Sequence, residues 1–124
     1  MKAIIVDDDK LVRKTLRKFL SELDFDVRTA ENGEFGFQLI KKEKPEIIFS
    51  DMLMPGIDGI TLCRQIKEDP DLSSAKLILM SSLYKRSDTA RDGLECEYDG
   101  FMEKPFDYDD LVKIIRSLGL PDFK

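Results

Sequence analysis

Five short runs rich in apolar residues recur along the chain, and each run ends in polar or turn-forming residues. Compact apolar runs bounded by turn signals are typical of strands that are covered on both faces, as in a parallel sheet. The predicted strands span residues 2–6, 25–30, 47–51, 76–80 and 100–103.

Between these runs, apolar residues recur at steps of three and four, which predicts helices with one buried face. The predicted helices span residues 10–23, the segment from the turn at 31–33 to about residue 42, 60–68, 84–96 and 108–118. The helix predicted at 84–96 has few apolar residues and is interrupted by Gly93. A glycine inside a helix costs roughly 1 kcal/mol relative to alanine, so we expect this helix to be the least stable.

Strands that alternate with helices pair in parallel, because only a long right-handed crossover can reach a parallel neighbour. The alternation predicts an α/β fold, a doubly wound five-stranded parallel sheet with five helices. We expect a flavodoxin-like three-layer sandwich with the strand order 2-1-3-4-5. The length of 124 residues fits a single domain spanning residues 1–124.

Composition narrows the class of protein and its partners. Hydrophobic residues make up 42% of the chain and charged residues 36%, as in a soluble globular protein. The net charge of -5 argues against a direct nucleic-acid partner, because the phosphate backbone attracts basic surfaces. The apolar runs are too short for a signal peptide or a membrane helix, so we expect a cytoplasmic protein without membrane contact.

The histidine and cysteine content limits the catalytic and metal-binding chemistry that the chain can support. The chain has no histidine, which excludes a Ser-His-Asp triad, a histidine-rich zinc site and a phosphohistidine of its own. Its two cysteines, Cys63 and Cys96, fall in separate predicted helices. In a reducing compartment we expect them to act as small apolar residues and not as a disulfide.

Acidic residues follow two of the predicted strands. Asp7 and Asp8 follow the first strand and Asp51 ends the third, and these strands are neighbours in the predicted order. Two carboxylates about 4 Å apart repel by roughly 4 kcal/mol at an effective dielectric of about 20. A divalent cation with oxygen ligands, such as Mg²⁺, relieves that repulsion, and protonation of one carboxylate is the alternative. Asp51 taken alone could simply begin a turn.

Polar residues also follow the fourth and fifth predicted strands. Ser81 offers a hydroxyl donor and Lys104 a cation that could pair with Asp51 or with an anion attached to it. Each has an ordinary alternative, since Ser81 could cap a helix and Lys104 could be a solvated surface charge. Together they fit phosphoryl transfer to a carboxylate, because an aspartyl phosphate forms where the charge of the transferring group is neutralised.

Four motifs carry a resemblance to a known family. IIVDDD, SDMLMPGIDG, LILMSS and EKPF stand in the order and at the spacings of the receiver domain of bacterial two-component response regulators. The chain is similar to that family over nearly its whole length, and in particular to chemotaxis-type single-domain receivers. The resemblance implies that Asp51 is the phosphoacceptor, Ser81 the switch hydroxyl and Lys104 the phosphoryl-binding residue. It also implies that Phe101 is an aromatic rotamer switch, although the ring could simply pack beside the sheet.

The same resemblance implies a metal site. Asp7, Asp8 and Asp51, with the main-chain carbonyl of Leu53, would hold Mg²⁺ or Mn²⁺. Leu53 and Leu83 are apolar where some relatives carry polar side chains that position a hydrolytic water. We therefore expect slow loss of the phosphoryl group.

The implied activity is that of a signalling switch and not of an enzyme that turns over a substrate. A sensor histidine kinase or phosphotransfer protein would donate the phosphoryl group from its phosphohistidine. The signal would leave through the fourth helix, fifth strand and fifth helix. Its receiver would be an effector protein or a missing C-terminal output domain, and a phosphorylation-linked dimer is a further expectation.

Two other classes of protein are considered. One is a Mg²⁺-dependent phosphohydrolase with an aspartate nucleophile, which would want a second acid/base aspartate where Leu53 stands. The other is a receiver-like interaction module that never accepts phosphate. Such a module has no need of a repulsive carboxylate cluster.

Overall fold

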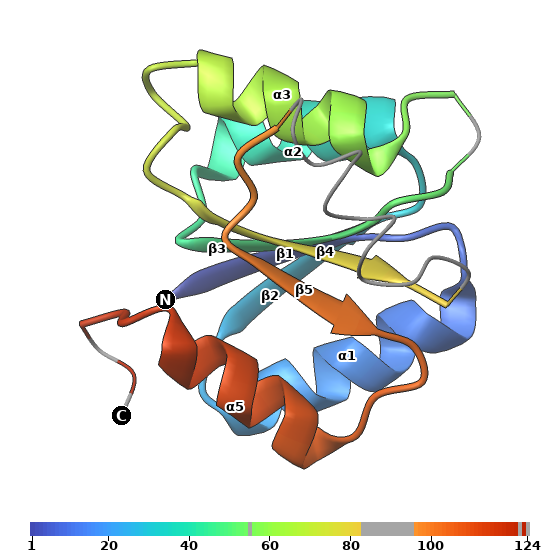
Figure 1. The fold of residues 1–124 in the computed structure, drawn as a ribbon, viewed down its shortest axis with the longest axis vertical. Coiled ribbons are helices and arrows are strands. Elements are labelled where there is room, and N and C mark those ends of the chain that lie inside the picture. The colour runs from blue at the N-terminus through green and yellow to red at the C-terminus, as the bar shows by residue number, and fades with distance from the viewer. Residues whose placement is uncertain (55, 83–95, 122, 124) are drawn as a thin grey trace.

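A five-stranded parallel sheet forms the middle layer of the protein in the computed structural model, which describes residues 1–54, 56–82, 96–121 and 123. The strand order is β2-β1-β3-β4-β5, and all four neighbouring pairs are parallel. The predicted fold and strand order are therefore confirmed (Figure 1). The strands are β1 (Lys2–Val6), β2 (Asp26–Ala30), β3 (Ile47–Asp51), β4 (Lys76–Ser81) and β5 (Gly100–Glu103).

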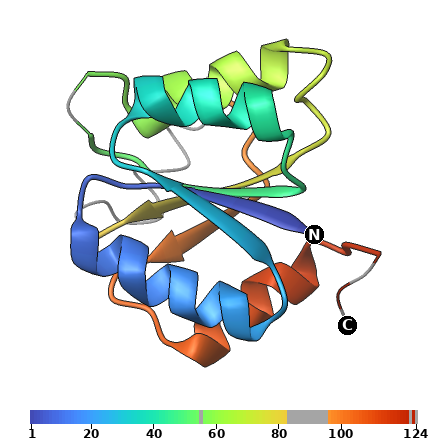
Figure 2. The same ribbon diagram turned by 180° about the vertical axis from the view of Figure 1, so that it is seen from behind.

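Four helices lie within the described residues and cover the sheet on both faces. They are α1 (Lys10–Glu22), α2 (Gly33–Glu43), α3 (Gly59–Glu68) and α5 (Tyr108–Ser117). Figures 1 and 2 show α1 and α5 on one face and α2 and α3 on the other. The helix predicted at 84–96 falls almost entirely on residues 83–95, which lie outside the described residues. No helix of the described part is both long and apolar enough to cross a membrane.

Each of these helices begins at a polar residue whose side chain accepts a hydrogen bond from the first turn. The capping residues are Asp9, Asn32, Asp58 and Asp107. At the start of α5 the cap is reciprocal, because the Asp110 carboxylate also accepts from the Asp107 backbone N–H. Caps of this kind satisfy backbone donors that have no partner inside the helix.

Two apolar cores lie on opposite faces of the sheet. Successive strand residues point to opposite sides, so Ile4 and Val6 pack towards α2 and α3, whereas Ala3 and Ile5 pack towards α1 and α5. All five residues of β3 are buried, as expected for a central strand. This double burial explains why the predicted strands are continuous apolar runs.

The cysteines depart from their expected role. Cys63 on α3 and Cys96 before β5 form a disulfide with their Cα atoms 6.1 Å apart. The expectation that they are unbridged apolar residues is therefore wrong. Both are buried in the core beside α2 and α3, and this packing across 33 residues of sequence is what brings them together.

Gly36 of α2 lies where the helix presses against β1. A Cβ at this position would lie 2.8 Å from Cγ2 and 2.9 Å from Cγ1 of Val6. Gly36→Ala normally gains about 1 kcal/mol of helix propensity, but overpacking costs typically 1–3 kcal/mol. We therefore expect Gly36→Ala to lower the free energy of unfolding by about 1 kcal/mol, measured by urea denaturation. Gln38→Ala, on the exposed side of α2, is the control and should change it little; a stabilised Gly36→Ala variant would contradict the close packing.

Candidate functional site

The site lies at the carboxyl ends of β1, β3, β4 and β5. Val6 is paired with Ser50, so the next residues, Asp7 and Asp51, stand side by side on neighbouring strands. Ser81 ends β4 opposite Glu103, which places Lys104 one residue beyond the end of β5. The register of a single sheet thus brings together residues from distant parts of the sequence.

Three carboxylates converge at this edge. One oxygen from each of Asp7, Asp8 and Asp51 lies within 4.8 Å of the other two. Asp7 is fully buried, Asp51 is nearly so, and Asp8 is exposed. Hard cations prefer carboxylate oxygens, and Mg²⁺ usually keeps several waters besides one or two carboxylates. The group could therefore hold a metal ion, with Asp8 on its solvent side.

Lys104 contacts both buried members of the carboxylate group. Its Nζ lies 2.7 Å from Oδ2 of Asp7 and 3.3 Å from Oδ1 of Asp51. Burial opposes the charge of the ammonium group, but the hydrogen bond and charge of Asp7, followed by those of Asp51, outweigh it and raise the pKa of Lys104. The lysine is therefore held as a cation between the two carboxylates.

One lysine does not neutralise the group. Burial is the largest cause that raises the pKa of Asp51, from 3.8 to about 6, and the charge of Asp7 adds to it. Lys104 lowers this pKa by charge and by hydrogen bonding, and Asp8 raises it further. The negative charge at Asp51 thus lacks full compensation from the protein, which fits a site that takes a cation.

Three hydrogen bonds that the sequence pattern does not predict hold Asp7 in place. Its Oδ1 accepts from the backbone N–H of Asp9 at 2.9 Å, while its main-chain carbonyl accepts from Nη1 of Arg13 at 2.7 Å. Its own N–H donates to the carbonyl of Ala30. Arg13 was missed because only its position in the second turn of α1 points it back to the end of β1.

The backbone after Asp51 is fixed by two hydrogen bonds. The N–H of Met52 donates to the carbonyl of Met80 at 2.9 Å, and the N–H of Gly59 donates to the carbonyl of Met52 at 3.0 Å. A Cβ at Gly59 would lie 2.8 Å from the Met52 Cα and would collide with the Asp51 carbonyl. The start of α3 is therefore pressed against the loop that carries Asp51. Leu53 has an exposed side chain in this loop, and the metal-ligand role of its carbonyl stays a prediction.

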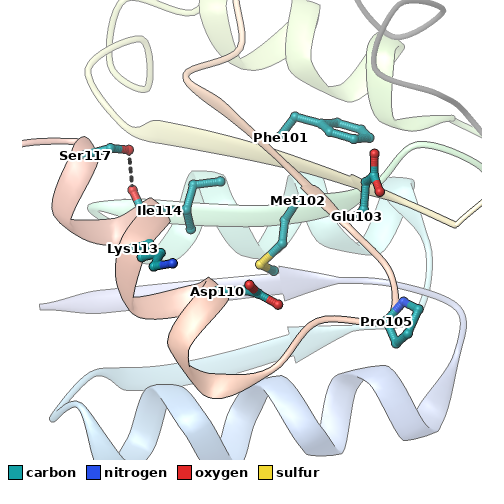
Figure 3. A pocket seen from close by; sticks show the side chains of 8 residues that line it. All are labelled: Phe101, Met102, Glu103, Pro105, Asp110, Lys113, Ile114 and Ser117. Atoms are coloured by element: carbon teal, nitrogen blue, oxygen red, sulfur yellow. Dashed lines mark hydrogen bonds between the residues drawn. The ribbon is translucent and has the colours of Figure 1, made fainter.

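Ser81 ends β4 next to the end of β3 that carries Asp51, whereas Phe101 lies within β5 and is paired with Leu79. Ser81 is 2% exposed, and its main-chain carbonyl accepts from the N–H of Lys104 at 3.0 Å. Phe101 is buried and packs in the core beside α2 and α3, on the other side of β5 from Met102 (Figure 3). Ser81 is therefore linked directly to the backbone of the lysine, whereas Phe101 contributes to packing. Their switch roles stay predictions, and Leu83 lies outside the described residues.

Comparison with protein families gives a match to the response regulator receiver domain over residues 3–116. The chain belongs to this family. Receiver domains are modules of two-component signal transduction and act as phosphorylation-dependent switches, which fits the acidic group of Asp7, Asp8 and Asp51. The expected family is therefore confirmed.

Curated relatives of this receiver domain are longer proteins. The response regulator MprA of Mycobacterium leprae is 32% identical over 119 residues, covering 95% of this chain and 50% of the relative. The response regulator PleD of Caulobacter vibrioides is 33% identical over 121 residues, covering 98% of this chain and 26% of the relative. The chain thus spans half or less of the length of these relatives.

Solved structures of similar proteins have the same fold as this chain. A putative response regulator from Chloroflexus aurantiacus is 31% identical with a TM-score of 0.87, covering 94% of this chain and 95% of that one. The chemotaxis protein CheY4 of Vibrio cholerae has a TM-score of 0.88 at 20% identity, covering 94% of this chain and 97% of that one. The receiver fold therefore spans nearly the whole chain.

The raised pKa of Asp51 has a consequence for stability. Because this pKa is about 6 in the folded protein against 3.8 ordinarily, the folded state binds the proton more tightly. The stabilisation from this carboxyl is complete below about pH 4 and is lost as the pH rises through about 6. Without divalent cations, Asp51→Asn should therefore raise the free energy of unfolding by about 1–2 kcal/mol near pH 7 and have little effect near pH 4.

Urea denaturation in the presence of a chelator measures this difference. Asp71→Asn removes one exposed carboxylate at the opposite end of the sheet and is the matched control. It should show no comparable gain at either pH. A loss of stability in Asp51→Asn near pH 7 would mean that the ion pair with Lys104 outweighs burial and repulsion.

Proposed function

We propose that residues 1–124 act as one receiver module in which Asp51 accepts a phosphoryl group from the phosphohistidine of a sensor kinase or phosphotransfer protein. The main support is the contact of Lys104 with both Asp7 and Asp51 inside a group of three carboxylates. Such a cluster is costly as a purely structural feature. A site that gathers a nucleophilic carboxylate, a lysine and metal ligands suits phosphoryl transfer.

The transfer step uses the carboxylate of Asp51 as nucleophile. One Asp51 oxygen forms a bond to phosphorus while the bond between phosphorus and the donor's histidine nitrogen breaks, and that nitrogen takes up a proton. Asp51 must be ionised to attack, and its pKa of about 6 leaves it mostly ionised near neutral pH. Lys104 lies 3.3 Å from Asp51 Oδ1, where its charge can neutralise a phosphoryl oxygen.

Asp7, Asp8 and Asp51, with the main-chain carbonyl of Leu53, would hold Mg²⁺ or Mn²⁺ in this proposal. A bound cation supplies further neutralisation of the transferring phosphoryl group. Asp8 is the exposed member of the group and would face the side from which the ion and the donor approach. Arg13 and the N–H of Asp9 would keep Asp7 oriented.

Ser81 and Phe101 would carry the signal away from Asp51. The phosphoryl dianion would attract the Ser81 hydroxyl, and the ring of Phe101 would respond to the rearrangement. Charge added by phosphorylation commonly biases a two-state element in this way. Ser81 and Lys104 are already joined through the backbone, so both can respond to the same dianion.

The output surface would include β5 and α5. A pocket of about 500 Å³ runs along these elements and is lined by Phe101, Met102, Glu103, Pro105, Asp110, Lys113, Ile114 and Ser117 (Figure 3). Its partner would be an effector protein, an output domain beyond this chain, or a second receiver in a phosphorylation-linked dimer. We place the protein in the cytoplasm, without a direct nucleic-acid or membrane partner.

Incubation with acetyl phosphate and Mg²⁺ tests the proposal. We expect a mass increase of one phosphoryl group per chain, absent in Asp51→Asn and retained in Asp71→Asn. Sustained release of phosphate over many turnovers would instead identify a phosphohydrolase. A wild-type protein with no adduct would identify an interaction module that does not use phosphate.

Leu53 provides a second test. Its side chain is 39% exposed two residues after the phosphoacceptor, where it offers an attacking water no hydrogen bond. Leu53→Asn should shorten the lifetime of the phosphorylated protein roughly tenfold, less than the roughly 10²–10⁴-fold of a full general acid or base, because an amide only orients the water. Leu11→Asn, at an exposed leucine of α1, is the matched control and should leave the lifetime unchanged. Rapid loss from the wild type that Leu53→Asn does not alter would contradict this role.

A further inference from the structure

Two side-chain contacts join α3 to the chain that enters β5. The first is the disulfide between Cys63 and Cys96. The second is the ion pair between Nζ of Lys67 and Oδ2 of Asp99, at 2.9 Å. Cys63 and Lys67 are four residues apart and so lie on the same face of α3. The two contacts therefore run parallel between the same pair of segments.

The ion pair holds its two segments together without help from the sulfur atoms. Asp99 Oδ2 also accepts from the N–H of Leu77 at 2.8 Å, and the N–H of Asp99 donates to the carbonyl of Leu77 at 2.8 Å. Lys67 also donates to the carbonyl of Ala75 at 3.0 Å. This network keeps α3 near the entry to β5 when the cysteines are reduced, and the disulfide adds a covalent restraint at Cys96 that the network does not supply.

The cysteine pair is well placed for bonding. Its Cα atoms are 6.1 Å apart, within the usual range for a disulfide of about 4.4–6.8 Å. Both cysteines are buried, and Cys96, which is 7% exposed against 0% for Cys63, is the more accessible of the two. The chain has only these two cysteines, so the intramolecular pairing is unambiguous.

We propose that Cys63 and Cys96 form a reversible dithiol–disulfide pair that makes this receiver sensitive to the redox state, with a low-molecular-weight disulfide such as glutathione disulfide as oxidant. The Cys96 thiolate attacks one sulfur of the oxidant and releases one thiol. Cys63, after losing its proton, then attacks Cys96 of the mixed disulfide and releases the second thiol. The protein gives up two electrons and two protons, and the oxidant becomes two thiols.

The bond closes a covalent ring over residues 63–96. This ring contains β4 with Ser81 but excludes Asp51 and Lys104. Cys63 lies on α3, and the start of this helix at Gly59 is pressed against the loop that carries the phosphoacceptor Asp51. Oxidation thus restrains Ser81 relative to α3 in the arrangement in which Lys104 pairs with Asp7 and Asp51.

The regulatory consequence rests on the function proposed above. If Ser81 moves towards a phosphoryl group on Asp51, a restraint on the segment that carries Ser81 opposes the phosphorylated state. At equal donor and Mg²⁺, the oxidised protein should therefore carry roughly fivefold less phosphoryl group than the reduced protein, at the lower end of usual coupling between two sites.

The thiol state is tested first, and independently of phosphorylation. Wild-type protein is equilibrated with mixtures of reduced and oxidised glutathione. Its free thiols are then alkylated and its mass is measured by mass spectrometry. We expect an internal disulfide that reducing agent reverses, whereas Cys63→Ala and Cys96→Ala form none. Reduction of the wild type should lower Tm by roughly 10 °C, as expected for a ring of this length. Two free thiols, or only glutathione adducts, under oxidising mixtures would overturn the proposal.

Phosphorylation is then compared in the oxidised and reduced wild-type proteins after the glutathione is removed. Cys96→Ala should show the same extent after either treatment. Equal extents in the two wild-type forms would overturn the regulatory effect while leaving the redox pair established. Asp51→Asn should still form the disulfide. Absence of phosphorylation in both wild-type forms would refute the proposed function and, with it, the regulatory effect. The evidence for a reversible disulfide between Cys63 and Cys96 would not be affected.

Discussion

Repulsion among carboxylates at the end of the sheet is the constraint on which the site depends. Asp7 and Asp51 are brought side by side by strand pairing, and both are buried where charge is costly. Lys104 relieves part of this cost from the end of β5, but the pKa of Asp51 remains raised to about 6. The remaining negative charge is what would favour a bound cation at this site under the proposed function.

The rest of the structure holds this unfavourable cluster in place. Apolar residues of β1 and β3 are buried between two layers of helices, which fixes the register at the strand ends. The lack of a side chain at Gly59 lets α3 begin against the Asp51 loop, and Arg13 and the N–H of Asp9 hold Asp7. Hydrophobic burial in the cores thus offsets electrostatic strain at one edge.

The sequence was sufficient for the fold because apolar runs and helical periodicity report burial directly, and the strand boundaries differ from the structure by one residue at most. The sequence was also sufficient to predict that Asp7, Asp8 and Asp51 lie close together, since the topology alone places the ends of parallel strands at one edge of the sheet. It was insufficient for the bond between Cys63 and Cys96, which depends on how α3 packs beside the entry to β5. The contact of Arg13 with the backbone of Asp7 depends on side-chain direction, which no pattern of residue types encodes.

Calorimetric titration with Mg²⁺ near neutral pH tests the central claim most directly, because it measures whether the carboxylate group takes a cation. One ion should bind per chain, and Asp8→Asn and Asp51→Asn should each weaken binding by about tenfold or more, whereas Asp71→Asn should bind as the wild type does. Absence of binding, or equal binding by all three variants, would contradict the account.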